Sequence, residues 1–445
     1  MRRFFKVIVW IVGSLAALIA AVAIYILLIF DPNKYKAEIA AAVHDATGRE
    51  LNIQGELKLS FFPWMGVETQ SLSLSNPPDF GQAPFAKIES AAIKVKLLPL
   101  FKKDVEVDTI TLNGLYLQLI RTATGQNNWD DLGTQAGKET PAPAGTNTTS
   151  TNAAAPLLTA FAIGGIQIRD ATVIWDDRQS KTRYALNKLS LRTGPISLVE
   201  PVALKLETDF ISDAPALSAH LGLSTEASYK LDTRQLRLKG VQLTARMHGV
   251  ELGVQEATLA LSGDALLKLA EQQYQITDLK LLTSLQGEQF PGKRIEAKLN
   301  ANVGADLHQG TLTIKPFNLE AWNIKVNGAV HGNGLLDAPR FSGNITIPSF
   351  NARELLGHFS KEPLDTADPQ ALSAVSAVVA FKASPTNAEL TKLEATLDQS
   401  RISGNAALID FSRPAYRFQL AVDDIDADRY LPHPSSISEP ATAMR

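Results

Sequence analysis

Alternating polar and apolar residues are the feature that most constrains the fold of this chain. In LEAWNIKVNGAVHG, residues 319–332, every second residue from Trp322 onward is apolar or Gly, and most residues between them are polar. Successive side chains of a β-strand point to opposite sides of the sheet, so this pattern predicts a strand with one apolar and one polar face. Similar segments recur roughly 20 times between residues 51 and 423, separated by turn-forming Gly, Asn, Asp and Pro.

Two architectures would satisfy such strands. Two sheets can face each other as a sandwich with a closed core, or one strongly curved sheet can fold over its own apolar face and leave a groove. From residue 157 onward the sequence lacks the linkers that would divide it into sandwich domains of about 100 residues. We therefore expect a mainly β fold, in which an N-terminal transmembrane helix precedes an elongated, curved, mostly antiparallel β-sheet groove with a few short helices.

Three short segments are predicted to be helices. Residues 32–47, PNKYKAEIAAAVHDAT, have apolar residues at helical spacing and are followed by Gly48, which is typical of a helix C-terminus. Residues 264–273 (DALLKLAEQQ) and 351–359 (NARELLGHF) each begin with a residue that favours the N-cap position. Gly332 to Gly334 fit a hairpin turn better than a nucleotide-binding loop.

The amino terminus predicts a membrane anchor. Residues 7–30 carry no charged side chain and, at 1.5 Å per residue, would span about 36 Å as a helix. Arg2, Arg3 and Lys6 precede this run, so the positive-inside rule places the amino terminus in the cytoplasm and the rest of the chain across the membrane. A cleaved signal peptide is the alternative, but the run is longer than the roughly 7–15 residues of a signal h-region.

A low-complexity segment divides the chain. Residues 133–156 consist largely of Thr, Ala, Pro and Gly, which cannot bury enough apolar surface to offset their ordering entropy. The expected organisation is residues 1–30 as a cytoplasmic stub and transmembrane helix, 31–132 as a helix plus the start of the sheet, 133–156 as a disordered linker or loop, 157–432 as the continuing β-groove and 433–445 as a truncated tail.

Composition excludes several classes of function. The formal net charge is −3 with 20% charged residues, so there is no basic surface of the kind that nucleic acid demands. The absence of Cys excludes a thiolate nucleophile and a Cys-ligated metal. The seven His are scattered without metal-binding spacing, and no nucleophile elbow or phosphate-binding loop occurs. We expect no catalytic residues, no metal and no cofactor, and therefore no enzyme.

Two acidic segments are the features that could point to an enzyme or a metal site. Asp424, Asp426 and Asp428 have the first spacings of a calcium loop, but Arg429 stands where the Gly is required and Ser435 where the closing Glu is required. A solvated strand end, with Arg429 offsetting part of the charge, explains the segment better. Residues 127–131, NNWDD, fit a turn with a packed Trp as well as a polar catalytic patch. An enzyme acting on lipids or glycans would need paired carboxylates in a cleft.

Several segments resemble a known family. Residues 31–67 and 94–132 look like the amino-terminal part of AsmA-family proteins of the Gram-negative envelope, and NARELL (351–356), LDQS (397–400) and DDIDADRYLP (423–432) follow in that family's order. The resemblance implies a single-pass inner-membrane protein with its bulk in the periplasm and a chorein-like region at residues 31–132. It also implies a β-groove related to those of TamB and YhdP, along which phospholipid acyl chains slide, and it supplies no catalytic residues.

The leading hypothesis is therefore an inner-membrane-anchored periplasmic β-groove that binds and conveys phospholipid for outer-membrane lipid homeostasis and assembly. The alternative is a periplasmic scaffold or chaperone that assists outer-membrane protein assembly through exposed strand edges. Expected partners are phospholipid, the inner membrane, and outer-membrane or periplasmic proteins. The residues expected to face the groove are Leu57, Leu59, Ile93, Val95, Leu97, Leu115, Leu117, Leu119, Val202, Leu204, Leu206, Trp322, Ile324, Val326, Phe418 and Leu420.

Overall fold

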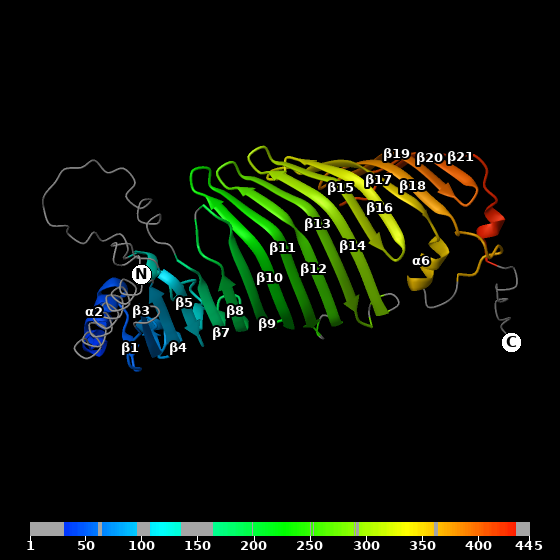
Figure 1. Ribbon diagram of the computed structural model, residues 1–445. Coiled ribbons are helices and arrows are strands. Elements are labelled where there is room, and N and C mark those ends of the chain that lie inside the picture. Colours follow the sequence, from blue (N-terminus) through cyan, green and yellow to red (C-terminus); the bar gives the residue numbers. More distant parts are fainter. Residues whose placement is uncertain are drawn as a thin grey trace, which may run out of the picture. The chain divides into compact units, whose positions relative to one another are not determined.

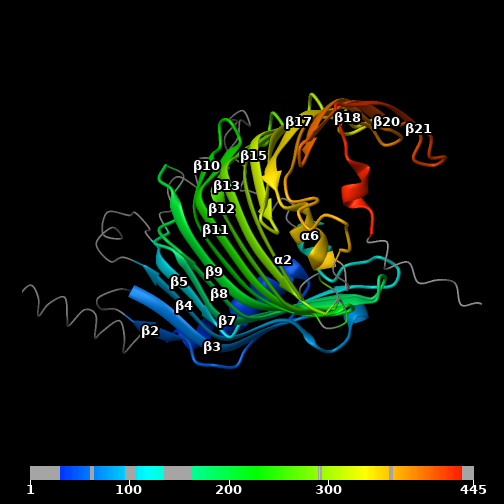
Figure 2. The same ribbon diagram turned by 90° about the vertical axis from the view of Figure 1, so that its right-hand side faces the viewer.

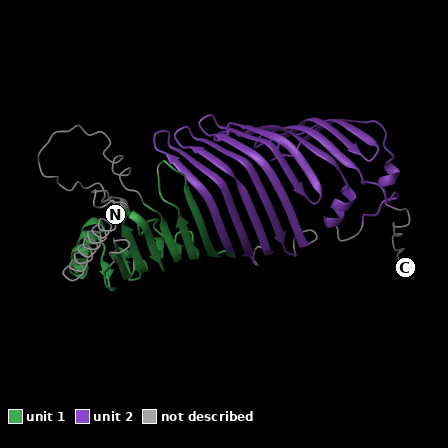
Figure 3. Cartoon of the chain, in the orientation of Figure 1, with its two compact units in different colours: residues 1–218 green, residues 219–445 purple. Residues whose placement is uncertain are grey.

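The computed structural model describes residues 31–60, 65–95, 107–134, 163–197, 199–249, 251, 253–288, 290, 293–359 and 364–432 of the 445-residue chain. The chain divides into two compact units, residues 1–218 and 219–445 (Figure 3). The predicted membrane span, Leu97, most of the predicted linker and the C-terminal tail lie outside the described residues. Within the described ranges, no helix combines the length and the apolar character needed to cross a bilayer.

The described chain is mainly β, as predicted, and its 21 strands belong to one hydrogen-bonded sheet (Figure 1). Two facing sheets are not present among the described residues, so the sandwich alternative is wrong. The first unit contains η1 (Pro32–Tyr35), α2 (Lys36–Thr47), β1 (Leu51–Ile53), β2 (Lys58–Ser60), β3 (Met65–Ser75), η2 (Pro78–Phe80), β4 (Pro84–Val95), β5 (Val107–Asn113), β6 (Tyr116–Arg121), α4 (Asp131–Thr134), β7 (Ile166–Asp177), β8 (Thr182–Thr193) and β9 (Val202–Asp213).

Strand direction in the first unit changes at β7. β1 and β2 both pair with β3, β3 pairs with β4, and β4 pairs with β5 and β6, all antiparallel. β5 and β6 then lie parallel to β7, and antiparallel pairing resumes through β8 and β9. The described strands of this unit are thus mostly antiparallel, with β7 parallel to both β5 and β6.

The first predicted helix is confirmed as η1 and α2. The Asp31 side chain accepts the backbone N–H of Asn33 at 3.0 Å, and Pro32 occupies the first turn, where its missing N–H costs nothing. Gly48 ends α2 in the left-handed conformation, with a φ of 71°, and donates its N–H to the carbonyl of His44. This is the C-terminal geometry for which Gly is favoured.

The second unit is a succession of antiparallel neighbours. β10 (Ala216–Lys230) leads into it, and from β11 onward every strand pairs with the next one along the chain. Figure 2 shows that this part of the sheet is curved, since β11 to β13 stand upright while β17 to β20 arch over α6. The elements are β11 (Gln235–Gly249), β12 (Val254–Lys268), β13 (Gln273–Gln286), β14 (Arg294–Asp306), β15 (Thr311–Ala321), β16 (Ile324–Asn333), β17 (Arg340–Phe350), α6 (Ala352–Phe359), β18 (Val375–Ala383), β19 (Ala388–Leu397), β20 (Ser400–Leu408), β21 (Tyr416–Val422) and η6 (Ala427–Tyr430).

Bulges accompany this curvature. β11, β13, β15, β17 and β19 each carry one more residue than the neighbouring strand at one point of the ladder. Such a bulge bends the strand and increases its twist. Two of the bulges are held by a side chain of the next strand: Asp264 accepts the N–H of Gly240 at 2.7 Å, and Asn302 accepts the N–H of Asp278 at 2.8 Å.

The predicted helix at residues 264–273 is wrong. Residues 264–268 are the end of β12, where Leu267 lies opposite Leu236 of β11 and Tyr274 of β13. Pairing on both sides satisfies the backbone groups of this segment, so its neighbours override a local helical preference. The third predicted helix is confirmed as α6, and the Asn351 side chain accepts the N–H of Glu354 at 3.1 Å.

The alternation in residues 319–332 also begins later than expected. Trp322 and Asn323 have φ values of 49° and 62° and form a two-residue turn between β15 and β16, so the strand begins at Ile324. Positive φ at both central residues is typical of the hairpin turns that match strand twist. The Trp322 ring packs against Phe359 of α6, with 5.5 Å between ring centroids. The hairpin predicted at Gly332 to Gly334 is present, since β16 ends at Asn333 and Gly334 has a φ of 64°.

Candidate functional site

One face of the second unit is apolar from β11 to β21. Residues directly opposite each other on neighbouring antiparallel strands point to the same side of the sheet, so the register defines the two faces. We call the side defined by the following row the apolar face. The row runs through Leu238, Ala265, Ile276, Val303, Ile314, Val330, Gly343, Phe381, Leu390, Ala406 and Phe418.

A second row on the same face is formed almost entirely of Leu. The intervening residues of the strands form the polar face, where hydroxyl, amide and ammonium groups follow one another. The apolar row is Leu243, Leu261, Leu281, Leu299, Leu319 and Val326, and the adjacent polar row is Gln242, Ser262, Lys280, Asn300, Asn318, Asn327 and Thr346. The sheet of this unit is therefore amphipathic from β11 to β17.

No second layer of protein closes the apolar face among the described residues of this unit. Its buried apolar residues are all Ala: Ala219, Ala257, Ala301, Ala329 and Ala371. A sandwich core would instead bury Leu, Ile, Val and Phe. Leu319 is 36% exposed, and other large side chains of this face are only half-buried. The face is thus a large apolar surface that the described chain leaves accessible.

The first unit carries a corresponding apolar face, on which register places most of the predicted groove residues. Val67 of β3 lies between Leu59 and Ile93. Leu117 and Leu119 lie opposite Val173 and Trp175 of β7, and Leu206 lies opposite Leu191 of β8. Val202 and Leu204 alternate in step with Leu206, and Val95 lies opposite Val107.

Two predicted groove residues of this unit lie outside strands. Leu57 is buried just before β2, and its backbone N–H and carbonyl both bind the Asn33 side chain, so it belongs to the contact with η1. Leu115 precedes β6, and its carbonyl accepts the N–H of Thr172 at 2.7 Å.

The remaining predicted residues lie in the second unit. Ile324 and Val326 are on the apolar face, as are Phe418 and Leu420, which are 69% and 49% exposed on β21. Trp322 occupies the hairpin turn instead. Contact of these residues with lipid stays a prediction.

A buried polar cluster joins α2 to the turn after β6. Arg49, only 2% exposed, donates to Asp131 at 3.0 Å and to the carbonyl of Asn128 at 2.6 Å, and its guanidinium lies 4.3 Å from the centroid of the Phe85 ring. Asn128 is fully buried and binds Asn76 and the backbone of β6. The NNWDD segment is therefore a turn with a structural role, and its Trp129 packs against Trp175.

A second cluster, here called the C-terminal cluster, brings together the three later sequence segments. Arg429 donates to Asp368 at 2.7 Å and also binds Gln399, and Tyr430 donates its hydroxyl to Asp398 at 2.9 Å. Arg353 of α6 donates to the carbonyl of Ala371 at 2.9 Å. NARELL, LDQS and DDIDADRYLP thus meet at one place. Arg429 pairs with Asp368, not with the acidic residues next to it in sequence.

Hydrogen bonds and burial shift the pKa values of three groups in this cluster. Burial raises the pKa of the Asp398 carboxyl, but donation from Leu372, Tyr430 and Ala374 outweighs it, so the pKa lies below its usual value. Burial, followed by the hydrogen bond to Asp398, raises the pKa of Tyr430. Donation from Gln370, then from Arg429, lowers the pKa of Asp368. The groups that make these contacts hold α6, the 364–372 segment and η6 together.

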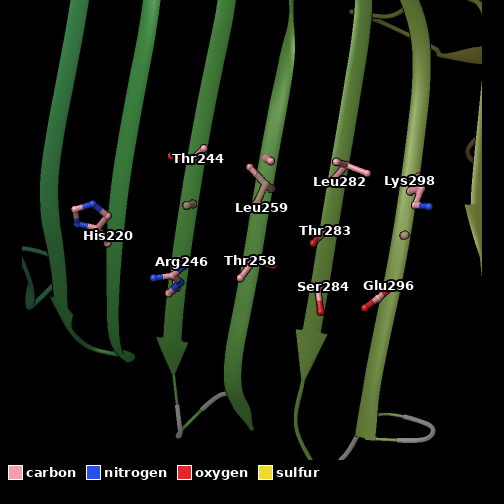
Figure 4. A pocket seen from close by; sticks show the side chains of 13 residues that line it. His220, Thr244, Arg246, Thr258, Leu259, Leu282, Thr283, Ser284, Glu296 and Lys298 are labelled. Carbon is pink, nitrogen blue, oxygen red and sulfur yellow. The ribbon is translucent and has the colours of Figure 1, made fainter.

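A separate hollow of about 400 Å³ lies over β11 to β14 (Figure 4). Short side chains such as Thr258 and Ser284 form its floor, between the longer Arg246, Glu296 and Lys298. By register these side chains belong to the polar face, so the hollow is distinct from the apolar surface. Its charged side chains carry both signs, and Leu259 and Leu282 also line it.

Comparison with known proteins agrees with this architecture. The chain is 28% identical over 141 residues to the "AsmA family protein YhjG" of Escherichia coli (strain K12), a match that covers 29% of this chain and 20% of that relative. The aligned part thus spans about a fifth of the relative's length. No solved structure matches. The family model described as "AsmA family" matches residues 1–444, and the chain therefore belongs to the AsmA family.

Proposed function

We propose that this protein binds phospholipid acyl chains along its apolar faces and conveys them. The observation that carries the proposal is the continuous apolar face of β11 to β21, which no described layer covers. Each CH₂ group moved from water onto such a surface gains about 0.8 kcal/mol, so a long hydrocarbon chain would be held without specific contacts. Because neighbouring rows offer similar apolar surface, a hydrocarbon chain would move from one strand to the next with little change in free energy.

The chemistry of the face favours hydrocarbon over polypeptide. The inner strands pair on both sides, so their backbone groups are already used, and the two rows of the apolar face contain no hydrogen-bonding side chain. A peptide lying there would lose the hydration of its own N–H and C=O groups without compensation. An acyl chain has no such groups to satisfy. The phospholipid headgroup would stay in water at the margin of the face.

The cellular setting forms part of the proposal. An anchor at residues 7–30 would hold the protein in the inner membrane, with the described residues in the periplasm and the lipid serving outer-membrane homeostasis and assembly. Transfer of lipid needs no bond to be made or broken, so we propose a carrier rather than an enzyme.

The test is lipid extraction after mild purification. Val326→Glu places a charge on the apolar face, whereas Asn327→Glu places the same side chain on the polar face of the same strand. Native mass spectrometry should find phospholipid on the wild type and on Asn327→Glu, and about tenfold less on a folded Val326→Glu. Equal lipid content in the two variants, or a lipid-free wild type, would refute the proposal.

One observation favours a second function. β21 pairs only with β20 among the described strands, and its Tyr416 and Phe418 are 73% and 69% exposed. Such an edge can accept a further strand from a partner, as a scaffold or chaperone for outer-membrane protein assembly would. A wild type that lacks lipid but crosslinks to partner strands through β21 would favour this function.

A further inference from the structure

Three glycines on the apolar face each lie opposite a phenylalanine of the neighbouring strand. Gly generally weakens a strand, since it has no side chain to pack, so its recurrence opposite one residue type points to a common role. The pairs are Phe317 and Gly328, Phe341 and Gly332, and Phe381 and Gly343.

In each pair the phenylalanine ring fills the space that a glycine side chain would occupy. A Cβ atom on Gly328 would lie 2.9 Å from Cε1 of Phe317, and one on Gly343 would lie 2.9 Å from Cε1 of Phe381. For Gly332 the corresponding distance to Cε1 of Phe341 is 3.0 Å. These distances are shorter than a van der Waals contact between carbon atoms. The rings therefore lie across the neighbouring strand.

A ring that lies over a glycine leaves more room above the sheet than a side chain that stands up from it. The Leu row described above consists of branched side chains, which stand roughly perpendicular to the sheet. Around β15 to β18 the surface is instead formed partly by ring faces. The glycines thus determine how far the apolar surface rises above the backbone between β15 and β18.

We infer that these three Gly–Phe pairs determine how bulky an apolar chain the face admits, so that it accepts chains bearing branched or ring-containing groups as well as straight acyl chains. The inference rests on the proposed function, since it names the ligand class of the same surface. Gly328, Gly332 and Gly343 select apolar chains by size, whereas the Leu row supplies apolar area without such selection.

Gly332 is the most suitable position for a test. A Cβ at Gly328 or Gly343 would also lie 2.2 Å from a backbone oxygen of a neighbouring strand, so substitution there would distort the sheet. At Gly332 the nearest atoms belong to the side chains of Phe341 and Leu312. Gly332→Val should therefore lift the Phe341 ring without a backbone clash.

The experiment compares two probes, hexadecanoic acid and a hexadecanoic acid that ends in pyrene. Delipidated wild type should bind both. Gly332→Val should lose about tenfold in affinity for the pyrene probe and keep its affinity for the straight chain. Adding Phe341→Ala should restore pyrene binding, because the lifted ring is then absent. Gly304→Val is the matched control, since Gly304 lies on the polar face of β14 with open space around it.

The outcomes separate the two proposals. If the wild type binds both probes and Gly332→Val changes neither affinity, or both equally, the inference is wrong and the proposed function stands. A wild type that binds neither probe overturns both. If thermal unfolding shows that Gly332→Val does not fold, Phe341→Ala alone decides: it deepens the face and should raise the affinity for the pyrene probe relative to the straight chain, and an unchanged ratio overturns the inference.

Discussion

At the scale of single residues, Arg49 is the least exposed charged residue among those described in the first unit. Its guanidinium is buried and binds both Asp131 and the carbonyl of Asn128. Arg49→Met keeps much of the side-chain volume but leaves these acceptors without their donor. Because Asp131 is one-third exposed and can regain water, we expect a loss of about 2–3 kcal/mol in the free energy of unfolding, measured by urea denaturation.

Arg178→Met is the matched control for this prediction. Arg178 pairs with Asp176 at 3.2 Å, but its side chain is 50% exposed, so loss of the pair should cost less than about 0.5 kcal/mol. Equal losses in the two variants would show that the Arg49 cluster contributes no more than a surface ion pair.

A second residue-scale prediction concerns pH and Asp398. Its pKa is lower in the folded protein than the ordinary value of about 3.9, so the carboxylate stabilises the fold above about pH 4, and this contribution is lost as the pH falls through the folded pKa. Asp398→Asn should lower the free energy of unfolding by about 1 kcal/mol at pH 7. Denaturation at several pH values should show this difference shrinking toward pH 2. A difference that stays constant down to pH 2 would contradict the assignment.

At the scale of elements, the alternation of residues was sufficient to predict a mainly β chain and the polar and apolar sides of its strands, and helical spacing with capping residues was sufficient to predict α2 and α6. It was not sufficient to predict bulges or long-range contacts. A bulge such as that at Asp278 depends on Asn302 of the next strand, and the contact of Arg49 with Asp131 joins residues 82 apart in sequence. The misassigned helix at 264–273 has the same cause, since two flanking strands fixed its conformation.

The bulge on β13 provides a prediction at this scale. Asn302→Ala removes the acceptor for the N–H of Asp278, which has a φ of 52°. We expect a loss of about 1 kcal/mol in unfolding free energy, because the bulged backbone loses its partner. Asn300→Ala on the same strand should stay within about 0.5 kcal/mol, since no hydrogen bond of its side chain occurs within the described ranges. A larger loss for Asn300→Ala would argue against a special role for the bulge contact.

At the scale of the whole molecule, the open apolar face should appear in the heat capacity of unfolding. Compact domains gain about 12–15 cal/mol/K per residue on unfolding, chiefly from newly exposed apolar surface. In the described part of residues 219–445, the buried apolar residues are all Ala, so unfolding exposes less new apolar surface than in a closed core. Differential scanning calorimetry of the delipidated protein should therefore give a value below this range.

Addition of hexadecanoic acid should then raise the transition temperature, because the ligand binds the folded face, and should also raise the heat capacity change toward the compact range. The two effects must occur together, since both arise from covering the same surface. A heat capacity change of 12 cal/mol/K per residue or more without ligand would mean that protein already covers the face. Its accessibility to lipid, and with it the proposed function, would then have to be abandoned.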